Sequence, residues 1–311
     1  MENLAPFLLP GDAPPVAQAL YWLGYTVLFV FILSSMFGTG LSVTLRELLA
    51  PVRNRRLLTL ALVSNFVFVP LLAFVLIALI PMNGQLAGGL LLVSICAGAP
   101  STMKVAQVTG GNVARAVSLA IFMNIGTIIL MPIFLPFVLP GTQADTLEVT
   151  GYLVLLILIP ILLGLFLCSY SESLAGRLRP LVIRISDISV VVIFATIGVV
   201  FLSRMGHFVT GASGVTAIVV ATLFTLGALG LGFLLGSFAG ESREEIAFGA
   251  AFRNITAALV VIFAGFTNAM NDVLLMVLMV TFISVLTVSI LAGIIYRKRY
   301  GHEGPRAWFG A

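Results

Sequence analysis

Long stretches without charged side chains constrain the fold of this chain most strongly. No Asp, Glu, Lys or Arg occurs in residues 153–167, and residues 205–240 contain a single titratable side chain, His207. An apolar stretch of about 18 or more residues can cross the hydrocarbon core of a bilayer as a helix. Lipid offers no hydrogen bonds, so each stretch must satisfy its own backbone groups. No alternation of polar and apolar residues typical of membrane barrel strands occurs. The sequence therefore predicts an all-α membrane protein.

Short loops rich in Pro, Gly or Asn separate about nine apolar segments, each of a length that can span a bilayer. The expected transmembrane helices cover residues 17–43, 57–80, 85–108, 114–139, 149–170, 181–202, 214–238, 245–266 and 273–296. The N-terminus lacks the basic start of a signal peptide, so we expect the first helix to be retained. Only 9% of the residues are charged, against about 25% in soluble domains, as expected for helices in lipid.

Basic residues predict the orientation, because loops rich in Lys and Arg stay in the cytoplasm. Most of the 16 basic residues fall on one predicted side. They are Arg46, Arg53, Arg55, Arg56, Arg115, Arg177, Arg179, Arg184, Arg243, Arg297, Lys298, Arg299 and Arg306. We therefore expect a protein of the cell or inner membrane with its N-terminus outside and its C-terminus in the cytoplasm. This bias also requires an odd number of helices.

Two of the expected helices contain residues that interrupt a helix within the membrane. Residues 97–104 read AGAPSTMK, and residues 249–256 read GAAFRNIT. Pro removes a backbone donor, Gly loosens a helix, and charged groups in a membrane must face protein or water. We expect both helices to be discontinuous, although a kinked helix with a satisfied polar patch is the alternative for each.

The two breaks occupy matching positions if the first half of the chain lacks the first helix of a five-helix group. Paired breaks in two inverted repeats are the best sequence indication of a transporter binding site. We therefore expect an extracytoplasmic segment (residues 1–16), a first repeat (17–139), a second repeat (148–296) and a basic cytoplasmic tail (297–311).

The chain resembles the bile acid:sodium symporter family and its wider superfamily, which includes arsenite exporters. The resemblance is carried by MFGTGL at residues 36–41, Asn65 with Pro70, residues 98–105 followed by GNVA at 111–114, and Arg253-Asn254. It spans nearly the whole chain and implies a panel domain, a core domain and two crossing discontinuous helices. It also implies a secondary transporter rather than an enzyme.

The chain departs from the pattern of sodium-coupled members at the expected ion sites. Those members place a Glu where this chain has Gly249, and an amide where it has Arg253. A polar Ser-Asn pair is replaced by Met103 and Lys104. Hydroxyl ligands on the following helix are replaced by Ala116 and Ala120, whereas Asn65 is a plausible remnant of an amide ligand.

These replacements argue against bound sodium. Na⁺ prefers a shell of oxygen ligands, as hard cations do. A fixed cation 4 Å away would repel it by roughly 4 kcal/mol at an effective dielectric near 20, or about a thousandfold in affinity. We expect Lys104 and Arg253 to replace the two sodium ions, so that transport of a small organic anion, a carboxylate or bile-acid-like molecule, is Na⁺-independent. A buried Lys releases its proton readily, so Lys104 could also carry a proton.

The candidate residues for substrate or ion binding are polar or charged and lie near the two breaks. They are Lys104, Arg253, Asn254, Thr102, Ser101, Asn65, Thr256 and Asn124. Structural alternatives remain open: Lys104 could extend to the membrane interface, Arg253 could serve only the fold, and the small polar residues could join helices. Asp187 is either a local partner of Arg184 or a counter-ion of Lys104 or Arg253.

Other functions have less support in the residues. A conventional Na⁺-coupled organic anion symporter is the main alternative. An arsenite exporter is disfavoured because those proteins have a Cys thiolate ligand where this chain has Ser101. Cofactors, resident metals and nucleic acid partners are not expected, since no zinc spacing, nucleotide loop or catalytic triad occurs. The expected partners are membrane lipid and the anionic substrate, and Cys96 and Cys168 are expected to stay unpaired. The oligomeric state is not indicated.

Overall fold

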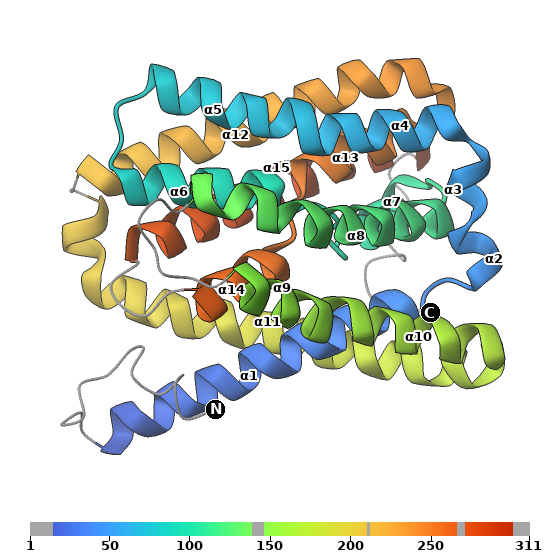
Figure 1. The fold of residues 1–311 in the computed structure, drawn as a ribbon, viewed down its shortest axis with the longest axis horizontal. Coiled ribbons are helices and arrows are strands. Elements are labelled where there is room, and N and C mark those ends of the chain that lie inside the picture. The colour runs from blue at the N-terminus through green and yellow to red at the C-terminus, as the bar shows by residue number, and fades with distance from the viewer. Residues whose placement is uncertain (1–14, 139–145, 210–211, 266–270, 301–311) are drawn as a thin grey trace.

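The computed structural model describes residues 15–138, 146–209, 212–265 and 271–300, and these ranges contain helices but no strand (Figure 1). Among these residues, seven helices are long and apolar enough to cross a membrane. They are Trp22–Gly40, Arg55–Leu79, Val113–Pro136, Thr146–Tyr170, Ser213–Gly240, Arg243–Ile262 and Asp272–Tyr300. The predicted all-α membrane fold is confirmed.

Each expected helix has a counterpart, and several consist of consecutive segments. The first half contains α1 (Pro15–Gly40), α2 (Leu45–Leu48), α3 (Ala50–Arg53), α4 (Arg55–Val63), η2 (Ser64–Phe68), α5 (Val69–Leu79), α6 (Gly84–Ile95), α7 (Thr102–Thr109) and α8 (Val113–Val138). The second half contains α9 (Thr146–Leu153), η3 (Val154–Leu158), α10 (Ile159–Tyr170), α11 (Glu172–Val209), α12 (Ala212–Gly236), η4 (Ser237–Ser242), α13 (Arg243–Ala251), α14 (Ile255–Gly265) and α15 (Asn271–Tyr300).

The largest correction concerns α11, which starts at Glu172 although the sequence predicted a loop up to residue 181. The hydroxyl of Ser171 accepts a hydrogen bond from the backbone N–H of Leu174 and so caps this earlier start. Pro180, the residue before the predicted start at 181, lies inside the helix.

Smaller corrections occur at other helix ends. α1 ends at Gly40 rather than at residue 43. The loop that follows holds the short helix α2, whose start is fixed by a reciprocal capping box between Thr44 and Glu47. α15 continues to Tyr300, so the predicted tail (297–311) begins inside a helix. The rest of that tail and most of the predicted N-terminal segment (1–16) lie outside the described residues, and the repeat boundaries stay a prediction.

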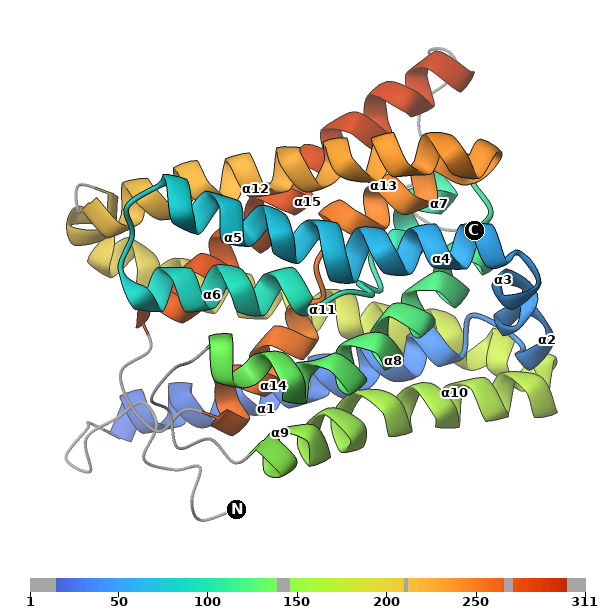
Figure 2. The same ribbon diagram turned by 45° about the horizontal axis from the view of Figure 1, so that its top comes forward.

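The helices divide into two layers (Figure 2). α1, α10 and α11 pack against one another and form the panel layer, while α6, α12, α13 and α15 pack in the core layer. α1 and α10 approach closely at Gly40 and Gly164, where an added Cβ would lie within 2.4 Å of a backbone oxygen of the other helix. Small residues allow such close contact between membrane helices. The GTG sequence at residues 38–40 therefore has a packing role within the panel layer.

Large apolar side chains cover the outer surface of the bundle. Ile129, Leu234 and Phe166 are each at least 60% exposed. Such a surface suits contact with acyl chains rather than water, because soluble monomers rarely expose extended apolar areas.

Candidate functional site at the helix crossing

Both predicted breaks are present, and they contact each other. The first separates α6 from α7, and the second separates α13 from α14. α6 and α14 lie on one side of the crossing, and α7 and α13 lie on the other (Figure 2). The backbone N–H of Asn254, in the second break, donates to the carbonyl of Cys96, in the first, at 2.8 Å. The two crossing discontinuous helices of the predicted fold therefore meet through their backbones.

Arg253 is buried at this crossing, with 3% of its surface exposed. Its Nε donates to the carbonyl of Val93 at 3.0 Å, and its Nη2 donates to the carbonyl of Ser94. Its Nη1 donates to Asn65 Oδ1 at 2.7 Å and to the carbonyl of Ala250 at 3.3 Å. Among the described residues, all of its hydrogen-bond partners are neutral oxygens. The guanidinium thus sits in a shell of oxygen acceptors contributed by three separate segments.

The position of Arg253 follows from the unsatisfied carbonyls at the end of α6. The last four carbonyls of a helix have no partner within it, and they carry the negative end of the helix dipole. In the membrane interior no water can satisfy them. Arg253 supplies both donors and positive charge to Val93 and Ser94, close to the end of α6 at Ile95. One side chain therefore stabilises a helix end that lies 160 positions away in the sequence.

Asn65 faces the crossing because its helix contains a π-turn. The turn η2 ends just before Pro70, whose ring would clash with the carbonyl of Phe66 in a regular α-helix. Asn65 is 1% exposed, donates to the carbonyl of Ala61 at 3.0 Å and accepts from Arg253. Asn65, which was predicted to be a remnant of an ion ligand, therefore binds the guanidinium of Arg253.

α8 connects the two breaks through Asn124. Its amide donates to the carbonyl of Gly98 at 2.8 Å and accepts from the amide of Asn254 at 2.6 Å. Thr127, one turn further along α8, accepts from the N–H of Ala97 at 3.0 Å. Gly98 has a φ of 86°, a conformation that favours glycine. Sequence reasoning included Asn124 and Asn254 but missed Thr127, whose spacing from Asn124 was the available signal.

Lys104 lies apart from this buried group. Its Nζ pairs with the carboxylate of Asp187 on α11, and the two side chains are 50% and 47% exposed. Asp187 is thus the counter-ion of Lys104, one of the pairings that the sequence left open. Among the described residues, Lys104 and Arg253 share no hydrogen-bond partner. The pair links α7 to the panel layer.

The hydroxyl candidates have different environments. Thr102 is the first residue of α7, and its hydroxyl donates to the carbonyl of Ala99 at 2.8 Å. Ser101, just before it, is exposed. Thr256 is 1% exposed, and its hydroxyl has no hydrogen-bond partner among the described residues.

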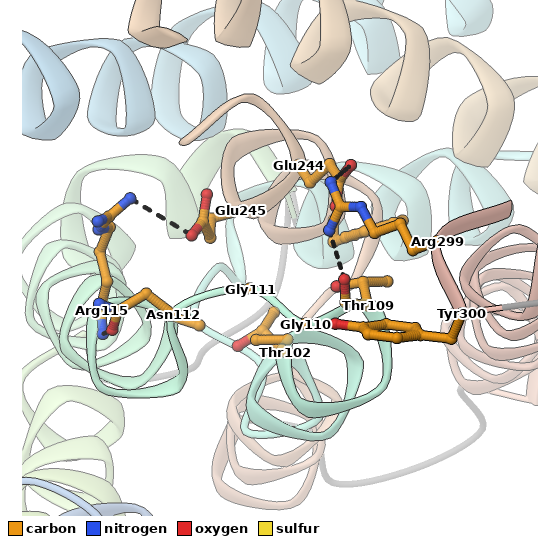
Figure 3. Close-up of a pocket in the computed structure, with 13 residues that line it drawn as sticks. Thr102, Thr109, Gly110, Gly111, Asn112, Arg115, Glu244, Glu245, Arg299 and Tyr300 are labelled. Carbon is orange, nitrogen blue, oxygen red and sulfur yellow. Dashed lines mark hydrogen bonds and ion pairs between the residues drawn. The ribbon is translucent and has the colours of Figure 1, made fainter. Parts of the chain in front are cut away.

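A cavity of about 380 Å³ lies beside α7, between the starts of α8 and α13 and the end of α15 (Figure 3). Thr102 lines it together with four charged side chains, Arg115, Glu244, Glu245 and Arg299. Arg299 donates to Glu244 at 2.7 Å and to the carbonyl of Thr109. The sequence analysis gave Glu245 no role, although it lies four residues before Gly249 and so on the same helix face.

Residues 28–211, more than half of the chain, match the Sodium Bile acid symporter family. The chain belongs to this family. Membership indicates a transporter rather than an enzyme.

Curated relatives are similar over part of their length. A probable chloroplastic sodium/metabolite cotransporter, BASS2, of Oryza sativa subsp. japonica is 24% identical over 71% of this chain and 52% of its own. BASS1 of Arabidopsis thaliana, with the same description, is 27% identical over 47% of this chain and 37% of its own. The chain thus covers about half or less of the length of these relatives.

Gly249 lies on α13 at the position where the resemblance predicts a Glu in sodium-coupled members. An added Cβ at Gly249 would meet no heavy atom within 4 Å. The position therefore has room for a side chain that the sequence does not provide. Within the described residues no group of three or more His, Cys, Asp or Glu side chains could hold a metal ion.

Proposed function

We propose that this protein is a secondary transporter of a small organic anion and that Arg253 takes the place of a bound sodium ion. The observation that carries the proposal is the oxygen shell around the Arg253 guanidinium at the helix crossing. Carbonyl and amide oxygens are the ligands that a hard cation selects. Here a covalently attached cation occupies them.

The charge of Arg253 would prevent a sodium ion from binding beside it. An Na⁺ ion within 4 Å of the guanidinium would be repelled by roughly 4 kcal/mol at an effective dielectric near 20. The carboxylate that would offset this repulsion is absent at Gly249. The crossing would therefore be held together permanently, and transport would not require Na⁺.

We propose that the positive charge of Lys104 attracts the anion. It lies in the first turn of α7, whose N-terminal end carries the positive end of the helix dipole. Ser101 and Thr102 place hydroxyl groups at the same helix end. In the described state Asp187 neutralises Lys104, so a substrate carboxylate would have to take the place of the Asp187 carboxylate.

A conventional sodium-coupled symporter is the second candidate. The names of the curated relatives and the unfilled space at Gly249 favour it. A water molecule or a shifted side chain in that space would have to complete the ion shell.

The remaining proposals follow the charge distribution. We place the protein in the cell or inner membrane with its N-terminus outside and its C-terminus in the cytoplasm, in contact with lipid and the anion, and without cofactor or nucleic acid.

The deciding experiment measures thermal stability against a panel of small carboxylates and bile-acid-like anions, in Na⁺ and in choline buffer. A ligand that binds only the folded state raises the apparent Tm. We expect one anion to stabilise the wild type equally in both buffers, and Lys104→Ala to lose this response. Lys298→Ala, which removes an exposed Lys elsewhere, serves as the control. Stabilisation only in Na⁺ would establish the sodium-coupled alternative.

A further inference from the structure

Glu245 is a buried carboxylate whose role the crossing does not explain. Its side chain is 6% exposed, in the first turn of α13. Its Oε2 has no hydrogen-bond partner among the described residues. Glu245 is one of the residues that line the cavity of about 380 Å³ described above (Figure 3). A buried polar atom without a partner is costly, so native proteins rarely keep one without a reason.

The interaction of Glu245 with Arg115 is loose. Arg115 Nη1 lies 3.6 Å from Glu245 Oε1, whereas charge-assisted hydrogen bonds to a carboxylate are about 2.7–2.9 Å long. Burial favours the neutral carboxylic acid, and the nearby guanidinium favours the carboxylate. The two effects therefore oppose each other at this carboxylate.

Among the residues that the structure describes, no second cation forms an ion pair with Glu245. Glu244, its neighbour on α13, is held by Arg299 of α15. Tyr300 of α15 lines the cavity, while the residues of α7 that line it carry no charge. Arg243 points to α12, where it donates to the carbonyl of Phe233, and Arg55 and Arg56 of α4 are exposed.

We propose that Glu245 is a proton-binding site that couples proton movement to anion transport. The carboxylate takes a proton from a hydronium ion that reaches it through the cavity, which leaves a water molecule and a neutral acid, while Arg115 keeps its charge. Release of the proton to water restores the carboxylate. The proposal rests on the proposed transport function, since it names the ion that drives it.

A proton fits this site better than a sodium ion does. Sodium would need several oxygen ligands beside Glu245, and Arg115 would repel it. Glu245 lies one helical turn before Gly249, about 6 Å along α13. By resemblance, sodium-coupled members place a Glu at the position of Gly249. In this chain the carboxylate lies on the same helix face, but one turn earlier and beside an arginine.

Infrared difference spectroscopy of the full-length protein, without substrate, tests proton binding directly. We expect acidification to produce a carboxylic acid C=O band that Glu245→Gln loses. Glu244→Gln, which changes the neighbouring and more exposed acid, should keep the band. Arg115→Gln should move its appearance to higher pH, because the loss of the guanidinium favours the neutral acid. The Arg115→Gln spectrum also tests the assignment if Glu245→Gln fails to fold.

Three results would overturn the assignment: no band in the wild type, a band that survives Glu245→Gln, or a band that Na⁺ abolishes at constant pH. The last result would identify a sodium site. Anion binding is measured separately by thermal stability, so these failures are distinguishable from failure of the transport function. In proteoliposomes with a trapped pH dye, the anion found in the stability panel should drive proton flux in the wild type and not in Glu245→Gln. Flux that persists in the variant would also refute the coupling role.

Discussion

At the scale of single residues, Arg253 has two roles. It satisfies carbonyls at the end of α6, and it brings a permanent positive charge to the centre of the crossing. A bound ion can do the same, but an ion can leave, whereas a side chain cannot. The position of this charge is therefore fixed by the fold rather than by ion concentration.

Replacing Arg253 with Ala should destabilise the protein strongly. The change leaves buried carbonyls near the end of α6 without donors, at a cost of about 3 kcal/mol or more. Chemical denaturation in a mild detergent measures the difference. The exposed Lys298→Ala should change the free energy of unfolding by less than about 0.5 kcal/mol. A loss as small for Arg253→Ala would contradict the capping role.

Sodium dependence should be recoverable by changing two residues together. The double variant Gly249→Glu with Arg253→Gln returns the carboxylate and the amide typical of sodium-coupled members, and the space at Gly249 accepts a side chain. We expect Na⁺ to raise the apparent Tm of the double variant and not that of the wild type. The single variant Gly249→Glu is the control, because Arg253 still repels the ion. A wild-type response to Na⁺ would refute the replacement.

At the scale of helices, two contacts of the panel layer differ in kind. Gly40 and Gly164 allow α1 and α10 to touch along their backbones, and the pair of Lys104 with Asp187 ties α7 of the broken helix to α11. The first contact is apolar and tight, while the second is polar and half exposed. The second contact is therefore the one that a ligand can break.

Asp187→Asn should strengthen anion binding. Without the carboxylate, Lys104 no longer has to exchange one partner for another. Exposed ion pairs are worth about 0.2–1 kcal/mol, so Kd should fall by roughly 1.5- to 5-fold. Binding of the anion from the stability panel, measured by calorimetry, tests this. Glu172→Gln, an exposed acid on the same helix, should leave Kd unchanged. Weaker binding in Asp187→Asn would show that Asp187 itself serves the substrate.

Gly164→Ala and Gly151→Ala should change stability in opposite directions. A Cβ at Gly164 would lie 2.4 Å from the carbonyl oxygen of Phe37, and such overpacking costs about 1–3 kcal/mol. A Cβ at Gly151 meets nothing within 4 Å, so the higher helix propensity of Ala should stabilise by up to about 1 kcal/mol. Denaturation of both variants measures the signs. Equal effects would contradict the close approach of α1 and α10.

At the scale of the whole molecule, the basic loops predict a single orientation. Lys298→Cys should react with a membrane-impermeant maleimide only after the cell is opened, and Met82→Cys, in the loop between α5 and α6, should react in intact cells. The native Cys96 and Cys168 are buried and unpaired, so the background should be low. The reverse pattern would invert the topology.

The sequence predicted some features of the whole molecule and not others. Apolar length and helix-breaking residues predicted the helices and both breaks, because these depend on neighbours along the chain. The backbone acceptors of Arg253 lie on segments far apart in sequence, which no local pattern reveals. The sequence named Asp187 as only one of the possible partners of Lys104. Lys104 and Arg253 were both expected at the ion sites, yet Lys104 pairs with Asp187 on α11. Glu245 was missed because its burial comes from the packing around α13.

The hydrogen bond between Asn254 and Cys96 has a consequence for how the chain is made. While a ribosome has delivered only the first half into the bilayer, Val93, Ser94 and Cys96 have none of the donors that later satisfy them, since these come from the penultimate helical stretch. Backbone carbonyls without hydrogen-bond donors are costly in the bilayer core. The interrupted helix of the nascent first half must therefore stay in contact with water or with a chaperone until synthesis is almost complete.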